Sequence, residues 1–404
     1  MRVLLINITN GRGSTGKIVS SIARILQETG NEAYIGYGYF DSKERNTYCI
    51  KGYGINTLRW AILKSRITGY MGFDSKRATE AFLNWVNEIK PDVIHLHNIH
   101  TGYVNIELLF SYIKRKKIPV VWTLHDCWPF TGRCSHFVNA NCYKWKTGCY
   151  ACQDKNTFPK TYYFDHSKKM YELKKEIFTG VDNMLLVTPS NWLKMFVEQS
   201  FLKEYKCLTI HNGVNTNVFK PNNENKIRIR YSLDKYEGIV ISVASSWSNR
   251  KGLHLIYKLA DDMKSYKFII VGLNYKQLES CPKNIIGIGR LSNQNELAEF
   301  YSAADVFINC TLADNFPTVN LEALACNIPV VTFNTGGSPE GVPSGAGFVV
   351  PQNDLSSMEK KIKELVAHKT ERNYREYAIK YFDERTLFLE YIKLYKKVLE
   401  CKIN

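Results

Sequence analysis

Short apolar runs rich in β-branched residues alternate with longer amphipathic stretches along the whole chain. In the first half the apolar runs cover residues 3–6, 32–37, 93–96, 120–124, 184–187 and 207–210. In the second half they cover residues 239–243, 268–271, 285–288, 306–309, 330–333 and 347–350. Apolar runs that alternate with helical stretches are typical of parallel sheets covered by helices. The pattern therefore predicts an α/β protein with two doubly wound, Rossmann-like domains.

A turn and a linker separate the two halves. Asn212-Gly213 follows the last apolar run of the first half, and Pro221 closes the linker. With 404 residues and 45% hydrophobic content, the chain is long enough for two cores. We expect an N-terminal domain over residues 1–213, with a cysteine-rich insertion at about 127–160, and a second domain over residues 222–382.

Glycines gather in the first turn after a strand, in the segment Asn10-Gly11-Arg12-Gly13-Ser14-Thr15-Gly16-Lys17. A helix is predicted after it, over residues 17–28. Such a turn lets backbone amides approach a pyrophosphate at a helix N-terminus, although a plain tight turn has the same composition. The segment approaches a P-loop, but Ile18 stands where Mg²⁺ binding needs Ser or Thr.

Two segments of the second half carry charged residues at expected strand ends. Asp314 and Glu322 lie across a loop and the first turns of a helix, where carboxylates can accept hydrogen bonds from vicinal hydroxyls. Arg250 and Lys251 follow the first strand of this half, where they can meet a pyrophosphate. The alternatives are an ordinary capped helix and a solvated basic helix start.

The block from Asp314 to Glu322 resembles the E-x7-E signature of the retaining glycosyltransferases of family 4, which have the GT-B fold. Four further segments resemble this family in the same order along the chain: the glycine turn, His125-Asp126, the Asn212-Gly213-Val214 crossover and Lys251-Gly252. The resemblance implies two domains that face a central cleft. It also implies that a C-terminal helix over residues 383–404 crosses back to the N-terminal domain.

By this resemblance, specific residues hold a nucleotide diphosphate sugar. His125 and Asp314 contact the donor sugar, and Arg250 and Lys251 stabilise the leaving phosphate. Further donor contacts fall on Gly13, Ser14, Gly16, Arg290, Leu291, Asn315, Phe316, Pro317, Thr318 and Glu322. The chain departs from the family where Asp314 replaces Glu, where Asn315 and Pro317 replace two glycines, and where Ser245 replaces an arginine.

The implied activity is transfer of a sugar, with retention, from a nucleotide diphosphate sugar to a glycan acceptor. Uracil is the default base, and a lipid-linked oligosaccharide for surface polysaccharide is the favoured acceptor. Catalysis is expected to require no cofactor, because the chain has no D-x-D triplet for Mn²⁺. Two alternatives remain open: a nucleotide-sugar epimerase of the same fold, and a nucleotide-sugar-binding scaffold without turnover.

Five cysteines cluster in the insertion. Cys134, Cys142, Cys149 and Cys152 can bind one structural Zn²⁺ through four thiolates, although the irregular spacings also suit separate thiols or a redox pair. The remaining thiols are expected to be buried, as is usual in a cytoplasmic protein. His95, His97 and His100 are interpreted as core or cleft-lining residues because no acidic or cysteine partner lies beside them in the sequence.

The formal net charge is +16, with most of the excess in the N-terminal half. We find no motif for nucleic-acid binding, so nucleic acid is not expected as a partner. An anionic membrane surface is compatible with this charge and with a basic amphipathic helix over residues 57–66 that contains Trp60. The sequence predicts no membrane span and no signal peptide, so we expect a cytoplasmic protein that can lie at the inner face of the cell membrane.

Overall fold

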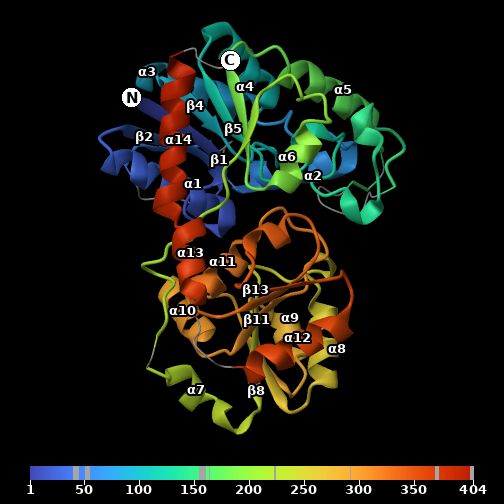
Figure 1. Cartoon of the computed structure of the whole chain (residues 1–404). Helices are drawn as coiled ribbons and strands as arrows, with labels where there is room; N and C mark the ends of the chain where they lie inside the picture. Colours follow the sequence, from blue (N-terminus) through green and yellow to red (C-terminus); the bar gives the residue numbers. More distant parts are fainter. Residues whose placement is uncertain are drawn as a thin grey trace. The chain divides into compact units, whose positions relative to one another are not determined.

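The computed structural model describes residues 1–39, 45–50, 55–153, 161–162, 164–222, 224–291, 293–368 and 373–400. The chain forms two compact units (Figure 1). The first comprises Met1–His211 and Phe388–Asn404, and the second comprises Asn212–Leu387. Among the described residues, no helix is both long and apolar enough to cross a membrane.

The first unit is built on a seven-stranded parallel sheet with the order β3-β2-β1-β4-β5-β6-β7. Its strands are β1 (Arg2–Thr9), β2 (Glu32–Tyr39), β3 (Thr47–Cys49), β4 (Val93–Leu96), β5 (Val120–Thr123), β6 (Met184–Thr188) and β7 (Cys207–Thr209). The residues of β4, β5 and β6 are buried throughout, which explains why these strands appear in the sequence as unbroken apolar runs.

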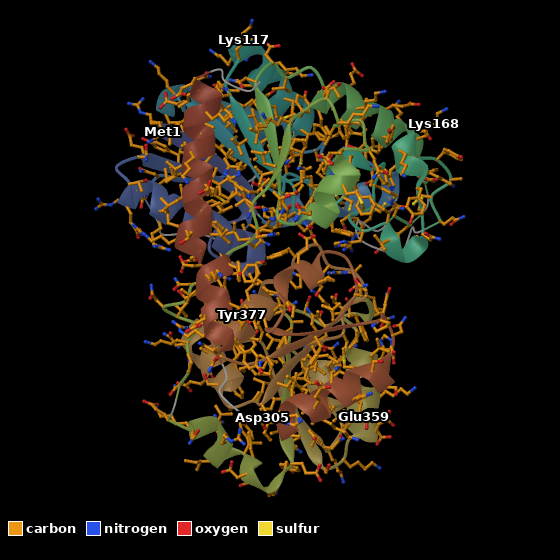
Figure 2. All side chains as sticks on the ribbon, in the orientation of Figure 1. Met1, Lys117, Lys168, Asp305, Glu359 and Tyr377 are labelled. Carbon is orange, nitrogen blue, oxygen red and sulfur yellow. The ribbon has the colours of Figure 1, made fainter. Side chains whose placement is uncertain are left out.

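Helices and short 3₁₀ turns connect the strands of this unit. The helices are α1 (Gly13–Glu28), α2 (Ile55–Thr68), α3 (Lys76–Ile89), α4 (Ile106–Lys116), α5 (Ser167–Phe178) and α6 (Asn191–Val197), and the turns are η1 (Trp128–Phe130), η2 (Val138–Ala140) and η3 (Lys144–Lys146). Figure 2 shows Lys117 and Lys168 at the surface of this basic unit.

The second unit contains a six-stranded parallel sheet with the order β10-β9-β8-β11-β12-β13. Its strands are β8 (Gly238–Val243), β9 (Tyr266–Val271), β10 (Ile285–Ile288), β11 (Val306–Asn309), β12 (Val330–Phe333) and β13 (Gly347–Val350). Asp305, labelled in Figure 2, joins two strands at their start, because its carboxylate accepts a hydrogen bond of 2.9 Å from the Ile239 amide.

Short and long helices alternate with the strands of the second unit. They are α7 (Lys226–Arg230), α8 (Leu253–Asp262), α9 (Tyr275–Glu279), α10 (Gln294–Ser302), α11 (Thr318–Ala325), α12 (Leu355–Ala367) and α13 (Tyr374–Phe382), with 3₁₀ turns η4 (Leu233–Lys235), η5 (Asn249–Lys251) and η6 (Ser338–Gly341). The last helix, α14 (Glu384–Leu399), begins in the second unit, and its residues from Phe388 onward belong to the first.

Every apolar run identified in the sequence forms a strand of one of these two sheets, and the parallel, doubly wound arrangement is confirmed. β3 was not predicted because its residues, Thr47-Tyr48-Cys49, include no aliphatic side chain and so form no apolar run. The prediction that α1 begins at Lys17 was wrong, because the helix begins at Gly13 and so includes most of the glycine turn.

The Asn212-Gly213-Val214 segment packs backbone to backbone against the chain that precedes α14. The Val214 amide donates to the Phe382 carbonyl at 2.8 Å, and the Glu384 amide donates to the Val214 carbonyl at 3.0 Å. A Cβ at position 213 would overlap the Cα of Glu384, so only glycine allows this pairing.

Gly213→Ala is therefore expected to destabilise the protein by roughly 1 to 3 kcal/mol, because the added methyl forces the paired segments apart. Gly289→Ala is the matched control, since a Cβ there would make only an ordinary contact of 3.8 Å with Leu278. Urea unfolding of both variants provides the measurement. Equal stability of the two variants would contradict this account of the crossover.

Candidate functional site

Charged residues of the second unit meet where the strand order reverses. β8 and β11 are neighbours in the sheet, and their connections run in opposite directions. Open α/β sheets bind ligands at this switch point, outside the carboxyl ends of the strands. The loop after β8 carries Arg250 and Lys251, and the loop after β11 carries Asp314.

The structure brings these three residues together. Lys251 Nζ lies 2.5 Å from Asp314 Oδ2, and both side chains are only about a fifth exposed. Arg250 donates through Nη1 to the Ala313 carbonyl, next to Asp314. The two loops thus form one cationic cluster in which a single carboxylate balances Lys251.

Close backbone contact at two glycines permits this arrangement. Gly252 has φ +74°, and a Cβ there would overlap the Cys310 carbonyl, so the glycine after Lys251 lets η5 approach the end of β11. Gly336 has φ +58°, and a Cβ there would overlap the Asp314 carbonyl. The Gly336 loop was not identified from the sequence, although Thr335-Gly336-Gly337 after a buried run is a signal for it.

A buried polar network ties the same loops to the sheet. The Asn309 amide donates to Asn320 Oδ1 at 2.8 Å, and the Asn320 amide donates to Ser338 Oγ at 3.2 Å. The Thr332 and Ser338 hydroxyls lie 2.7 Å apart. All four side chains are buried, so their hydrogen bonds hold the ends of β11, β12 and α11 in one geometry.

Glu322 lies on α11, and Tyr301 of α10 holds its carboxylate. The Tyr301 hydroxyl donates to Glu322 Oε2 at 3.0 Å. Tyr301 is fully buried, and this burial, with the nearby carboxylate, raises the pKa of its phenol well above the usual value. Tyr301 is therefore a constant hydrogen-bond donor to Glu322, a role that the sequence analysis missed because 21 residues separate the two.

The residues that follow Asp314, from 315 to 318, differ in burial and in position relative to α11. Phe316 is buried and packs on Phe382, with 6.0 Å between the ring centroids, so its side chain belongs to the core and only its backbone can meet a ligand. Asn315 is also buried. Pro317 caps the start of α11, and Thr318 is the first residue of that helix.

Arg290 and Leu291 follow β10, which is separated from β8 by β9. Arg290 is exposed, whereas Leu291 packs on the core. These two residues therefore lie at the edge of the sheet, two strands from the Lys251–Asp314 pair.

In the first unit, the glycine turn lies at the carboxyl end of β1. Gly13 has φ +69° and begins α1, and Ser14 beside it is exposed. Gly16 is buried, and a Cβ there would lie 2.6 Å from Thr9 Oγ1. Gly13 and Ser14 can thus present backbone amides to an anion at the helix N-terminus, while Gly16 serves the packing of helix against strand.

His125 lies at the carboxyl end of β5, where it is partly buried beside the fully enclosed rings of His95 and His97. Its Nε2 is 3.0 Å from Nδ1 of His97, which follows β4. Burial lowers the pKa of His125 to about 4, although the neighbouring Asp126 acts in the opposite direction. Burial also lowers the pKa values of His95 and His97 well below the usual range. All three rings are therefore neutral at pH 7.

A buried lysine supports the turn that follows His125. Lys174 of α5 donates to the Trp128 carbonyl at 2.5 Å and lies 4.1 Å from the centroid of the Trp128 ring. The Trp128 amide in turn donates to Asp126 at 2.9 Å, and His100 lies 3.1 Å from the same carboxylate. Burial lowers the pKa of Lys174 to about 7. Nothing in the sequence near Lys174 signals this contact.

Cys134, Cys142, Cys149 and Cys152, the cysteines of the expected zinc site, are not joined by disulfides in the structure. Cys149 and Cys152 both lie close enough to Cys134 to act on its thiol electrostatically, and Cys149 Sγ accepts a hydrogen bond of 3.0 Å from the Gly132 amide. Within the described ranges, no three His, Cys, Asp or Glu side chains are arranged to hold a metal ion. The zinc site stays a prediction, and residues 154–160 of the insertion and Cys401 lie outside the described residues.

Comparison with known proteins gives matches over both units. Residues 18–218 match the model described as Glycosyltransferase Family 4, and residues 223–381 match the model described as glycosyl transferases group 1. A curated relative, the putative colanic acid biosynthesis glycosyl transferase WcaC of Escherichia coli, is 22% identical over 297 residues, which cover 69% of this chain and 68% of that protein.

Solved structures of other proteins are similar to this chain over nearly its whole length. Sucrose-phosphate synthase of Thermosynechococcus elongatus has a TM-score of 0.74 and 18% identity, covering 99% of each chain. HepE of Anabaena, solved in complex with UDP-glucose, has a TM-score of 0.66 and 14% identity, covering 98% of this chain and 100% of that one.

The buried histidines predict a stability that depends on pH. Their native pKa values lie below the unfolded value of about 6.5, so the unfolded chain binds more protons as the pH falls. The histidine contribution to the free energy of unfolding is expected to be constant above pH 6.5 and to decrease towards pH 4, by roughly 3 kcal/mol from His125 alone. Denaturant unfolding at pH 7 and pH 4.5 measures this change.

His95→Gln should reduce the pH dependence, whereas His254→Gln, at an exposed position on α8, should leave it unchanged. Equal stability of the wild type at the two pH values would refute the assignment of neutral, buried histidines.

Proposed function

The chain belongs to family 4 of the glycosyltransferases, and we propose that it moves a sugar from a UDP-sugar to a glycan acceptor with retention of anomeric configuration. The two parallel sheets form the GT-B fold that the sequence predicted. The observation that carries the proposal is the cluster of Lys251, Arg250 and Asp314 at the switch point of the second unit, with Glu322 on the adjoining helix.

The donor diphosphate is the ligand that this cluster fits. Lys251 supplies a point charge and Arg250 a planar fork, which together suit the oxygens of a pyrophosphate. In the structure, the Asp314 carboxylate forms an ion pair with the Lys251 ammonium. When the donor binds, its diphosphate would form a second ion pair with the same ammonium group. The same charges stabilise the phosphate as it leaves, when negative charge develops on it.

Glu322 is the group that we assign to the ribose. A carboxylate accepts the paired donors of vicinal hydroxyls, and the Tyr301 hydroxyl holds one of its oxygens in place. In the same scheme the departing phosphate takes the proton of the acceptor hydroxyl, which attacks from the face that the phosphate leaves. No side-chain nucleophile is needed for this front-face route.

The choice of UDP and of a polysaccharide acceptor rests on similarity. HepE is solved with UDP-glucose, and WcaC is named for the biosynthesis of colanic acid. A capsular polysaccharide biosynthesis glycosyltransferase, CapM of Staphylococcus aureus, is 26% identical over 180 residues, covering 38% of this chain and 43% of that protein. A growing, lipid-linked oligosaccharide is the acceptor class that we propose.

An exposed apolar surface on the first unit supports an acceptor that is held at a membrane. Trp60, Leu63 and Ile67 are exposed on α2 at the spacing of one helical face, and the Trp60 side chain is 69% exposed. Tyr162 and Phe164 are exposed beside them, since the Tyr162 amide donates to the Arg66 carbonyl at 2.8 Å. Aromatic and aliphatic side chains with neighbouring Lys and Arg suit the interface of an anionic bilayer.

The donor site is tested with Glu322→Ala against a panel of UDP-, GDP- and ADP-sugars. We expect one class of donor to raise the melting temperature of the wild type and to be hydrolysed slowly. Both effects should be lost in Glu322→Ala, because the ribose hydroxyls lose their acceptor. Glu296→Ala makes the same chemical change at an exposed site on α10 and should behave as the wild type.

Donor binding without sugar release or transfer would support a scaffold, and sugar conversion without acceptor would support an epimerase. No stabilisation of the wild type by any nucleotide sugar would end the proposal.

The membrane surface is tested by sedimentation with vesicles that contain phosphatidylglycerol. The double variant Trp60→Ser/Leu63→Ser should bind at least roughly tenfold more weakly than the wild type, because two buried apolar side chains each contribute on the order of 1 to 3 kcal/mol. Tyr275→Ser removes an exposed aromatic ring from the second unit and is the control. Equal vesicle binding by all three proteins would show that Trp60 and Leu63 do not contact the membrane.

A further inference from the structure

We propose that His97 is a positioning residue that fixes the tautomer of His125, so that the His125 ring carries its proton on Nδ1 and acts as a hydrogen-bond donor. The contact of His125 with the donor sugar rests on the proposed function, but the tautomer itself does not.

The contact between His97 Nδ1 and His125 Nε2, at 3.0 Å, contains a single proton when both rings are neutral. Either His97 donates to His125 or His125 donates to His97. The ring planes are within 15° of parallel and the centroids are 5.3 Å apart, so the rings lie end to end with the two nitrogens between them, as an in-plane N–H···N hydrogen bond requires.

The surroundings of His97 decide between these two arrangements. His97 is 2% exposed, and its Nε2 has no hydrogen-bond partner among the described residues. If His97 accepted at Nδ1, its own proton would be on Nε2, as a buried N–H without an acceptor. Among backbone groups, buried N–H groups without a partner are rarer than buried carbonyls without one, and we extend this asymmetry to the ring nitrogens of His97. His97 therefore carries its proton on Nδ1 and donates to His125.

The neighbouring His95 ring supports His97, and its own hydrogen bonds fix its tautomer. The Thr123 hydroxyl donates its only proton to the Tyr391 hydroxyl at 3.1 Å. Thr123 must then accept from His95 Nε2, which lies 2.8 Å away, and His95 Nδ1 accepts from the Tyr395 hydroxyl at 2.7 Å. The His95 and His97 ring centroids are 4.0 Å apart. The tyrosines of α14 thus set the tautomer of His95, and the His95 ring supports His97.

The hydrogen bond from His97 determines which nitrogen of His125 carries the proton. Because its Nε2 accepts from His97, its Nδ1 carries the proton, and the ring can only donate from that atom. A hydroxyl oxygen of a sugar is an acceptor that suits such a donor. His97 thereby determines whether His125 offers a proton or a lone pair to the ligand.

Long-range ¹H–¹⁵N NMR spectra of the full chain with ¹⁵N-labelled histidine distinguish the two neutral tautomers. We expect Nδ1–H for His97 and His125 and Nε2–H for His95, with signals assigned through single His→Gln variants. His97→Phe should leave His125 as a mixture of tautomers. Tyr395→Phe, which removes a hydrogen bond from His95 but not the His97 contact, should leave the His125 tautomer unchanged. Nε2–H at His125 in the wild type would overturn the proposal.

Activity provides an independent readout. With the donor identified as above, His97→Phe should lower kcat roughly tenfold and change the nucleotide affinity less than twofold. His97→Gln, whose side-chain amide can still donate to His125, should restore the Nδ1–H tautomer and most of kcat. An altered tautomer with unchanged kcat would remove His97 from the reaction. Absence of donor turnover in a wild type that shows the expected tautomers would count against the proposed function alone.

Discussion

The candidate donor site depends on backbone contacts that only glycine permits. Gly252 lets the turn after β8 touch the Cys310 carbonyl, and Gly336 lets the loop after β12 touch the Asp314 carbonyl. Because both loops close on the same segment, Lys251 and Asp314 meet at 2.5 Å. The buried amides and hydroxyls beneath them then hold this geometry, since each unmet hydrogen bond in the core would cost on the order of 1 to 3 kcal/mol.

The two units share one arrangement of strands and loops but carry different side chains at the strand ends. Both place loops at the carboxyl ends of parallel strands, at the strand-order reversal in the second unit and beside it in the first. In the second unit the loops present charge, which suits a diphosphate. In the first unit the strands β4 and β5 end in neutral histidines that burial keeps unprotonated, so this unit offers directed hydrogen bonds rather than charge.

The fold and the family membership do not constrain the function equally. The GT-B fold by itself carries many activities, so the assignment to glycosyl transfer comes from the family. The site then adds detail that is particular to this chain. Asp314, one methylene shorter than glutamate, is paired with Lys251, and the Phe316 side chain is part of the core, so in the proposed donor site Phe316 can offer only its backbone.

The local sequence pattern was enough to predict the strands and several candidate site residues. The strands could be predicted because buried parallel strands are continuous apolar runs, and the glycine turn, His125 and the Asp314 to Glu322 block could be identified because each is a contiguous motif at a strand end. Pairings between distant segments could not be predicted. His97 meets His125 across 28 positions, Lys251 meets Asp314 across 63, and His95 meets Tyr395 across 300. Which side chains face one another there depends on strand order and on the path of α14, and those are properties of the packed chain that no local spacing encodes.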